Sequence, residues 1–514
     1  MTGTVAPAAL KAWLADGAEL AILDAREEGE FGQSHLFWAV PCPLSVAEIR
    51  APSLLPRLEA RIVCTDGGEG LAARLAALLA GMGFADLHVL EGGTPAWIAA
   101  GFEAFSGVNV PSKAFGEWVE HHYGTPSIDA EELAAMQAAG RKLAIFDSRP
   151  MAEFRAMSIP GGINVPGGEL AYRVPSLLAD AETLVVVNCA GRTRSILGAE
   201  SLRRAGLPNQ VVALRNGTMG WNLAGLACLT GQTARYPQGT PADAAQNFAR
   251  ARAFAAAQGV RWCTRADLPA DGRSTYTLDV RDPAEYAAGH LPGSVNAPGG
   301  QLVQATDNWV AVRHGRIVLV DDTGTRAAMT AGWLRQLGGW EVICLTDGLA
   351  EPLAQPAPVT APNVPVLTVA ALAAGPAIRV VDIARSLAFR AGHIPGAVWG
   401  VRTRLASLSL PDGVPVAIAA PDPRLGALAV TEVAALRPGP VFLLAGGTAA
   451  WAEAGHPLAA DRLVPADEDC IDAYLRPYDR NSGVAAAMRR YLAWEIDLVQ
   501  AVARDGDAPF GAWT

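Results

Sequence analysis

The chain has 514 residues, of which 51% are hydrophobic and 18% are charged, and its formal net charge is −10. This length is too great for one hydrophobic core and predicts three or four domains. The acidic balance, without a cluster of lysines and arginines, argues against a nucleic acid or an anionic membrane as the main partner.

The cysteines and the apolar segments bound the cellular context. Seven cysteines are scattered without CxxC spacing, which indicates free thiols in a reducing compartment rather than disulfides or a metal site. No secretory signal is visible at the N-terminus, and no apolar run reaches the ~18 residues that a membrane span needs. We therefore expect a cytoplasmic protein with no membrane segment, metal or cofactor.

One pattern recurs four times along the chain. An apolar stretch ends in Asp-x-Arg at residues 21–26, 144–149 and 276–281, and a copy with one inserted residue covers 380–385. A glycine turn followed by tryptophan closes the first, second and fourth copies. Strands that alternate with helices in this manner predict α/β units, each with a parallel sheet covered by helices.

We expect four units and a tail, separated by segments rich in proline, glycine or polar residues. The predicted units 1 to 4 cover residues 1–107, 124–231, 242–354 and 364–460, and the tail covers 461–514. The joints are expected near 106–126, 230–241 and 355–365, with a linking helix over 242–258.

In unit 1, Cys64 and Asp66 lie at the end of an apolar strand. Gly83 closes the next predicted helix and lies as far beyond Asp66 as Gly206 lies beyond Cys189 in unit 2. This register predicts an aspartate at the position that Cys189 occupies in unit 2, with Cys64 inside the strand.

Unit 2 contains the strongest candidate for a nucleophile. An apolar β-branched run over 185–187 ends at Asn188 and Cys189, and a short loop leads into a helix. The loop N–H groups and the positive end of the helix favour the thiolate form of a cysteine at this point, and Arg192 and Arg194 add positive charge. The alternative is that Cys189 is a small buried hydrophobic residue, and the neighbouring arginines argue against it.

These residues resemble the active loop of the rhodanese family of sulfurtransferases, in which four residues separate the cysteine from an arginine that Ser or Thr follows. Cys189, Arg194 and Ser195 match that pattern, whereas the related phosphatases of the fold have a loop one residue longer. The resemblance implies four tandem rhodanese-like domains of the α/β class, with Cys189 and Arg194 as catalytic residues. The residues that it implies for substrate binding are Ala190, Gly191, Arg192, Thr193, Ser195 and Arg149.

Two further sets of residues are predicted to have structural roles. Arg149 and Asp147 are expected to tie unit 2 together, by an ion pair or backbone contacts, in preference to a direct contact of Arg149 with substrate. His35, His290 and His393 occupy the turns of the other three units and have no counterpart in unit 2. We therefore expect these histidines to pack at their turns rather than to take part in catalysis.

Units 3 and 4 lack the cysteine. Asp321 and Ala419 each lie five residues before an arginine, as Cys189 does, so neither unit can form a persulfide. We expect one catalytic site, at Cys189, with units 1, 3 and 4 inactive. These three units would complete interfaces and wall one side of the cleft or, as the alternative, bind an acceptor or a sulfur-carrier protein.

The tail has apolar residues at helical spacing over 482–504, which predicts an amphipathic helix. We expect this helix to pack on a neighbouring unit, with a lid over one site as the alternative.

The predicted reaction is sulfur transfer in two steps. The Cys189 thiolate attacks the outer sulfur of thiosulfate, or of a donor such as a glutathione or protein persulfide, and sulfite leaves when thiosulfate is the donor. The Cys189 persulfide then passes its sulfur to cyanide or a thiol. Loop N–H groups would hold the terminal sulfur, Arg194 would organise the loop, Arg192 would attract the donor's sulfonate, and Ser195 would cap the helix or hydrogen-bond the sulfur.

Other functions remain open. Mercaptopyruvate is the less favoured donor, because the family's mercaptopyruvate enzymes resemble a Cys-Gly-x-Gly-x-Thr loop, whereas this loop carries two arginines. A phosphatase or arsenate reductase of the same fold is an alternative that the short loop argues against. A non-enzymatic persulfide carrier or scaffold is the other alternative, since three units lack the cysteine at this position.

Overall fold

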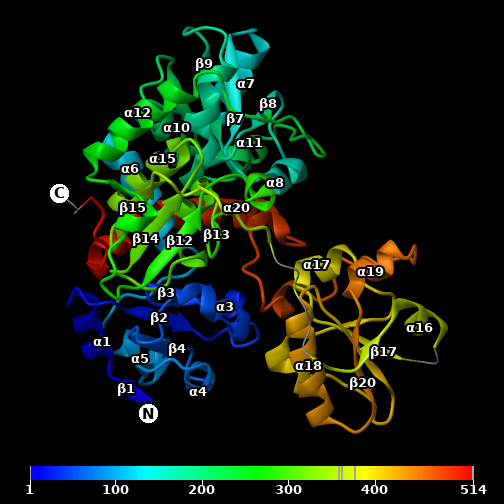
Figure 1. Cartoon of the computed structure of the whole chain (residues 1–514). Helices are drawn as coiled ribbons and strands as arrows, with labels where there is room; N and C mark the ends of the chain where they lie inside the picture. The colour runs from blue at the N-terminus through cyan, green and yellow to red at the C-terminus, as the bar shows by residue number, and fades with distance from the viewer. Residues whose placement is uncertain (1, 357–358, 360–362, 376–377, 512–514) are drawn as a thin grey trace.

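The computed structural model of the chain describes residues 2–356, 359, 363–375 and 378–511 (Figure 1). These residues form four five-stranded parallel sheets, one in each predicted unit. Every sheet has the same strand order: first strand at the edge, then fifth, fourth, second and third. The predicted fold class, α/β units with parallel sheets, is therefore confirmed. Parts of the predicted joint at 355–365 and the end of the tail lie outside the described residues.

Strands and helices alternate along the first half of the chain. Unit 1 contains β1 (Gly3–Val5), α1 (Pro7–Leu14), β2 (Ala21–Asp24), α2 (Glu28–Phe31), β3 (Ala39–Pro41), α3 (Ala47–Leu54), β4 (Ile62–Thr65), α4 (Leu71–Gly81), β5 (Leu87–Leu90) and α5 (Gly93–Ala99). After α6 (Val110–Tyr123), unit 2 contains β6 (Ser127–Ile128), α7 (Ala130–Ala138), β7 (Leu143–Asp147), α8 (Met151–Ala156), β8 (Gly162–Asn164), α9 (Leu170–Arg173), β9 (Leu184–Asn188), α10 (Thr193–Arg204), β10 (Val211–Leu214) and α11 (Gly217–Leu223).

The second half repeats this alternation. The predicted linking helix is α12 (Ala244–Ala257), and unit 3 contains β11 (Arg261–Cys263), β12 (Thr275–Asp279), α13 (Pro283–Ala288), β13 (Val295–Asn296), α14 (Gly299–Gln304), β14 (Arg316–Val320), α15 (Thr325–Leu337) and β15 (Glu341–Leu345). Unit 4 contains β16 (Val366–Leu367), α16 (Val369–Ala374), β17 (Arg379–Asp382), α17 (Ser386–Ala391), β18 (Val398–Trp399), β19 (Val416–Ala419), α18 (Pro423–Leu436), β20 (Val441–Leu444) and α19 (Gly447–Glu453), and the tail ends in α20 (Val484–Asp505).

The central strands are largely apolar because both faces of each sheet are covered. All five residues of β9 are buried, and so are all five of β14. Polar side chains satisfy free N–H groups where helices begin: Asp129 accepts the N–H of Glu132 at the start of α7, and Asp282 accepts that of Ala284 at the start of α13. Since all strands of a sheet are parallel, the loops after them meet at one edge, where Cys189 lies.

The segment predicted as a joint at 106–126 is a buried helix for most of its length. α6 has 14 residues, and Phe115 and Glu117 are among those that are buried. Its proline, Pro111, lies in the first helical turn, and Gly124 follows its last residue. Both are favoured helix-end positions for these residue types, so the segment between units 1 and 2 is a buried helix, which its composition alone did not predict.

Figure 1 shows unit 3 between units 2 and 1, with unit 4 beside unit 1. Ion pairs join units 2 and 3 and, in the same way, units 1 and 4. Arg326 of unit 3 binds Glu169 of unit 2, with 2.9 Å between nitrogen and oxygen. Arg402 of unit 4 binds Glu48 of unit 1 at the same distance. A shared hydrophobic core joins units 1 and 3 and includes residues of unit 2, α6 and α20, and α20 packs against α6 and α11. The prediction that the tail helix packs on a neighbouring unit is therefore confirmed.

The turn histidines pack as expected. His35, His290 and His393 each stack on the aromatic ring four residues earlier, with ring centroids 3.9, 3.9 and 3.8 Å apart. In each of the three, Nδ1 also lies within hydrogen-bond distance of a backbone carbonyl oxygen.

The described part of the chain contains no candidate for a membrane-spanning helix or for a metal-binding group of side chains. No helix in it combines the length and apolarity that crossing a membrane requires. Nor do three or more His, Cys, Asp or Glu side chains within it gather into a group that could hold a metal ion.

Candidate active site

Cys189 lies between the end of β9 and the start of α10, and only 2% of its surface is exposed. Its Sγ lies 3.5 Å from the Oγ of Ser195. The same Ser195 hydroxyl donates to the backbone carbonyl of Arg192 at 2.8 Å. Ser195 therefore closes the loop beside the sulfur. Among the described residues, no side chain caps the start of α10, so the structure places Ser195 near the sulfur but does not give it the capping role.

The first residues of α11 hold the loop by backbone hydrogen bonds. The Cys189 carbonyl accepts the N–H of Thr218 at 2.8 Å, and the Ala190 carbonyl accepts the N–H of Met219 at 3.0 Å. Gly217 has a φ of +53°, and a Cβ at this position would lie 2.3 Å from the Cys189 carbonyl oxygen. Only glycine permits this close approach with this backbone conformation.

Arg194 is held by a carboxylate that sequence analysis did not assign to the site. Its Nη1 and Nη2 donate to the two oxygens of Glu153 at 2.9 and 2.8 Å. Burial disfavours the charge on Glu153, but the Arg194 guanidinium outweighs this and lowers the pKa of Glu153 to about 2. Glu153 raises the pKa of Arg194 despite the burial of that side chain. The pair is therefore ionised at neutral pH, and its planar double hydrogen bond fixes the guanidinium.

Arg192 lies on the other side of the loop and faces α6. Its Nε and Nη2 donate to Glu117 at 2.7 and 2.8 Å, and it also pairs with Glu120. Its side chain is 9% exposed. Arg192, which was predicted to attract a donor's sulfonate, is thus ion-paired with two carboxylates. Nothing in the sequence pattern indicates these partners, because α6 lies outside the repeated units.

The C-terminal helix α20 covers the loop. Ala190 packs in one cluster with Met219, Met488 and Leu492, and a Cβ on Gly191 would lie 2.9 Å from Oε2 of Glu495. The tail therefore contributes side chains to the surroundings of Cys189, which is the arrangement that the lid alternative describes.

Glu495 of α20 connects three elements at this point. Its Oε1 accepts from the Oγ1 of Thr193 at 3.4 Å and from the Nζ of Lys113 on α6 at 3.2 Å. The hydroxyl of Tyr491 also donates to this oxygen, at 3.2 Å. The α20 helix is thus bound to the active loop and to α6 by polar contacts as well as by apolar packing.

Arg149 is engaged within its own unit. Its Nε and Nη2 donate to Asp147 at 2.8 and 2.6 Å, and Nη2 also donates to the carbonyl of Met157 at 2.5 Å. Arg26 and Arg281 make the same contacts in units 1 and 3. This repetition in units without the cysteine supports the predicted ion pair that ties the unit together.

Strand pairing locates the equivalents of Cys189 in units 1 and 3. In unit 2, Asn188 lies opposite Asp147, and Cys189 follows. The same pairing places Asp66 at the equivalent position in unit 1, as predicted from the closing glycine, and Asp321 in unit 3. Cys64 lies inside β4 and is fully buried.

The predicted register of unit 4 is wrong by one residue. Asp382 lies opposite Ala419 as Asp147 lies opposite Asn188, so the equivalent of Cys189 is Ala420. The loop between this position and Arg424 is one residue shorter than in unit 2. Counting back five residues from Arg424 therefore gave Ala419 instead of Ala420. The residue type remains alanine, which has no thiol.

The aspartates of units 1 and 3 show what these loops bind. Asp66 accepts the N–H groups of Gly68 and Ala72 at 2.8 and 2.9 Å. Asp321 accepts those of Arg326 and Ala327 at 2.9 and 3.2 Å. A strand-to-helix loop of this form is therefore a cradle for an anionic group.

Comparison with known proteins identifies the family. The model of the Rhodanese-like domain matches residues 6–100, 129–224 and 266–354, more than half of the chain. A crystal structure of thiosulfate sulfurtransferase from Pseudomonas aeruginosa is 44% identical, has a TM-score of 0.91, and matches over 99% of this chain and 99% of that chain.

Two shorter matches involve other proteins. The HTH-type transcriptional regulator Rv0324 of Mycobacterium tuberculosis is 35% identical over 106 residues, which are 20% of this chain and 45% of the regulator. The chain thus spans less than half the length of that curated relative. The structure of the Alr3790 protein from Anabaena sp. is 27% identical over 20% of this chain and 91% of that chain, with a TM-score of 0.19. The family-model match and the full-length match are decisive: this chain belongs to the rhodanese-like domain family.

Proposed function

We propose that this protein is a thiosulfate sulfurtransferase, which moves the sulfane sulfur of thiosulfate or a similar donor to a thiophilic acceptor through a persulfide on Cys189. The observation that carries the proposal is the full-length match to the thiosulfate sulfurtransferase of Pseudomonas aeruginosa. The spacing of Cys189, Arg194 and Ser195 and the anion-binding form of the loop support it.

The reaction has two displacement steps. In the first, the Cys189 thiolate attacks the outer sulfur of thiosulfate; a new S–S bond forms, the S–S bond of thiosulfate breaks, and its electron pair leaves with sulfite. In the second, the acceptor attacks the terminal sulfur of the Cys189 persulfide. When cyanide is the acceptor, thiocyanate leaves and the Cys189 thiolate is regenerated.

The backbone of the loop is proposed to bind the reacting sulfur. N–H groups between Ala190 and Ser195, including those of Gly191 and Thr193, would hold the anionic terminal sulfur, as the equivalent loops of units 1 and 3 hold their aspartates. Arg194, fixed by Glu153, would keep these N–H groups in place and add positive potential.

The two other arginines of the predicted site are assigned supporting roles. Arg192 is proposed to hold the loop against α6 through Glu117, which favours a positioning role over direct contact with the sulfonate. Arg149 is proposed to keep its contact with Asp147 throughout the reaction.

Units 1, 3 and 4 are proposed to be inactive. Asp66, Asp321 and Ala420 cannot form a persulfide, and the aspartates already fill their loops. The seven cysteines, all within the described residues, are free, which supports a reducing cytoplasmic location.

The test is a comparison of donors and variants with cyanide as acceptor. We expect thiosulfate to be preferred over 3-mercaptopyruvate, the Cys189→Ser variant to lose turnover, and a Cys64→Ala variant to keep it. Burial raises the pKa of the Cys64 thiol, so this cysteine should stay unreactive. A preference for 3-mercaptopyruvate, or loss of turnover in Cys64→Ala with the fold intact, would contradict the proposal.

A persulfide carrier for a protein partner is the second candidate. The observation that favours it is that three of the four units have Asp66, Asp321 or Ala420 in place of the cysteine, so they could hold a partner protein but not react. This function predicts one sulfur bound per chain with little turnover on cyanide or small thiols.

A further inference from the structure

Units 2 and 3 approach each other more closely than units 1 and 4 do. In the pair of units 2 and 3, two glycines lie at equivalent positions after β8 and β13, Gly168 and Gly300. A Cβ on Gly300 would lie 2.5 Å from the backbone nitrogen of Gly168, and one on Gly168 would lie 2.9 Å from that of Gly300. The two backbones are therefore in contact, and the hollow beside them measures only about 30 Å³.

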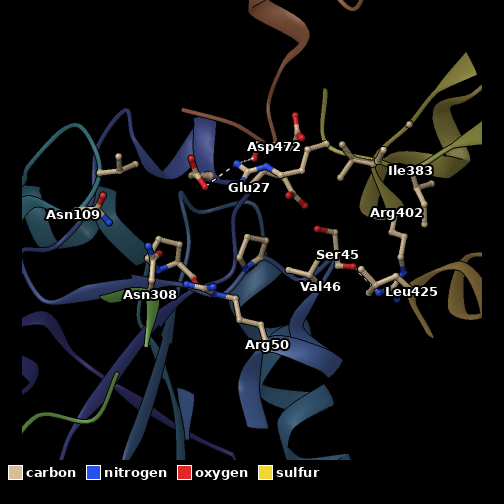
Figure 2. A pocket seen from close by; sticks show the side chains of 18 residues that line it. Glu27, Ser45, Val46, Arg50, Asn109, Asn308, Ile383, Arg402, Leu425 and Asp472 are labelled. Atoms are coloured by element: carbon tan, nitrogen blue, oxygen red, sulfur yellow. Dashed lines mark hydrogen bonds and ion pairs between the residues drawn. The ribbon is translucent and has the colours of Figure 1, made fainter. Parts of the chain in front are cut away.

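In the pair of units 1 and 4, side chains occupy these positions. The equivalents of Gly168 and Gly300 are Ser45 and Thr403. Arg402, which precedes Thr403, reaches across the interface to the Ser45 carbonyl at 2.6 Å and to Glu48. These side chains hold the backbones apart, and a pocket of about 330 Å³ lies between the units (Figure 2).

Three charged groups of this pocket have no opposite charge bound to them. Arg50 donates to the backbone carbonyls of Pro41 and Asp307, at 2.7 and 3.4 Å, and forms no ion pair with a described residue. Among the described residues, Glu27 and Asp472 form no ion pair either: Glu27 accepts from the Thr403 hydroxyl at 3.2 Å, and Asp472 accepts a backbone N–H.

The unpaired charges lie on opposite walls. Figure 2 shows Arg50 across the pocket from Glu27 and Asp472. Burial raises the pKa of Glu27, which is 5% exposed, to about 7. An unpaired buried carboxylate is costly, so a cation supplied from outside the chain would stabilise this wall.

The other charges that line the pocket are already paired. Arg385 binds Glu28 at 2.9 Å, and Arg402 binds Glu48 and Glu432 at 2.9 and 2.5 Å. Arg385 also donates to the backbone carbonyl of Asp472, at 3.0 Å. Within the described part of the chain, the pocket therefore presents one guanidinium without an ion pair on one side and two carboxyls without an ion pair on the other.

We propose that this pocket binds a small zwitterion, an α-amino acid or short peptide, with its carboxylate at Arg50 and its ammonium group at Glu27 and Asp472. A simple anion such as sulfate or thiosulfate would satisfy Arg50 but face the two carboxyls. The volume is at the lower end of the ~300–1,000 Å³ range of small-molecule pockets. No cysteine lines the pocket, so it is a binding site separate from the sulfur-transfer site.

Such a ligand would contact three parts of the chain. Among the residues that line the pocket, Glu27 and Arg50 belong to unit 1, Arg402 belongs to unit 4, and Asp472 belongs to the tail that continues into α20. A bound zwitterion would therefore hold units 1 and 4 and the tail together, and its binding should stabilise the full chain against thermal unfolding.

The experiment measures binding of glycylglycine to the full chain by calorimetry, with acetate, methylamine and sulfate as probes that lack one or both of its charges. We expect saturable binding of glycylglycine, and at least about tenfold weaker binding of each of the other three. Arg50→Gln and Glu27→Gln should each weaken glycylglycine binding at least about tenfold. Arg74→Gln, a change on the exposed face of α4 outside this pocket, should leave it unchanged.

Three results would overturn the proposal: no binding of glycylglycine, equal binding of acetate or sulfate, or unchanged binding in both pocket variants. Because two variants probe opposite walls, poor folding of one leaves the other as a test. A Cys189→Ser chain should still bind glycylglycine while it lacks sulfur transfer, so the outcome here is separate from that of the proposed function.

Discussion

The arginines of the Cys189 loop are ion-paired on both sides of the sulfur. Arg194 is bound by Glu153 of α8, and Arg192 by Glu117 of α6. Paired in this way, the guanidinium groups are fixed in place and still contribute positive potential, although less than free cations would. The loop is therefore organised before a donor arrives, which lowers the cost of binding an anionic sulfur.

An Arg194→Lys variant tests this organisation. It keeps the positive charge but loses the two parallel hydrogen bonds to Glu153, because an ammonium lacks the planar fork of a guanidinium. We expect kcat/KM for thiosulfate to fall by about tenfold to a hundredfold in steady-state assays. Arg203→Lys, on the outer face of α10 with a 36% exposed side chain, is the matched control. Wild-type rates in Arg194→Lys would show that the double hydrogen bond to Glu153 is not required.

The sequence was sufficient to predict Cys189 as the nucleophile, but not the carboxylates that bind the arginines of its loop. The spacing of Cys189, Arg194 and Ser195 was sufficient to predict the loop. Glu153 carried a usable signal, since unit 3 has Glu285 at the equivalent place and it binds Arg326. The carboxylates of α6 carried none, because that helix occurs once and lies outside the repeated pattern.

Among the secondary structure elements, α20 has the most direct effect on access to Cys189. Its apolar face contacts the loop through Met488 and Leu492, and its polar contacts through Glu495 reach Thr193 and Lys113. A persulfide beneath this helix would be shielded from water and from stray thiols. A donor has to reach Cys189 past the edge of α20 or by its displacement.

A Leu492→Ala variant should loosen this cover. We expect iodoacetamide to alkylate Cys189 several-fold faster than in the wild type, because a buried contact between α20 and the loop is lost. Ile496→Ala, on the exposed side of the same helix with 48% of its surface accessible, should alkylate at the wild-type rate. Equal rates in Leu492→Ala and the wild type, measured by mass spectrometry, would mean that α20 does not limit access.

Element prediction succeeded where the repeat was regular and failed where it was not. The strand order and the linking helix α12 followed from periodicity. The composition does not predict the buried helix α6, because proline and glycine are also typical of linkers. In the structure Pro111 and Gly124 lie at the two ends of this helix. In unit 4, the shortened loop before Arg424 shifted the count from this arginine by one.

The whole molecule combines one closed and one open pair of units. Glycine contacts bring units 2 and 3 together around the catalytic loop, whereas side chains such as Arg402 bridge units 1 and 4 across a pocket. The sequence predicted four units but not how they pair, because the pairing depends on contacts between distant residues: Arg402 and Glu48 are 354 positions apart, and Arg326 and Glu169 are 157 positions apart.

An Arg402→Ala variant should loosen the open pair alone. It removes the ion pairs of Arg402 with Glu48 and Glu432, so amide hydrogen exchange in α3 and in residues 402–407 should accelerate. Arg424→Ala, whose arginine pairs only within its own loop with Asp422, is the control. Sulfur transfer at Cys189 should be unchanged in both variants, and a loss of activity in Arg402→Ala would show that the open pair supports the catalytic loop.

Of the four loops, only the one at Cys189 is proposed to carry sulfur. The most direct test of this proposal is intact-protein mass spectrometry with peptide mapping after exposure to thiosulfate, beside a Cys189→Ser variant. We predict a gain of one sulfur atom on Cys189, its removal by cyanide, and no gain in Cys189→Ser. Sulfur on Cys64 or on another cysteine, or no sulfur at all, would contradict the account.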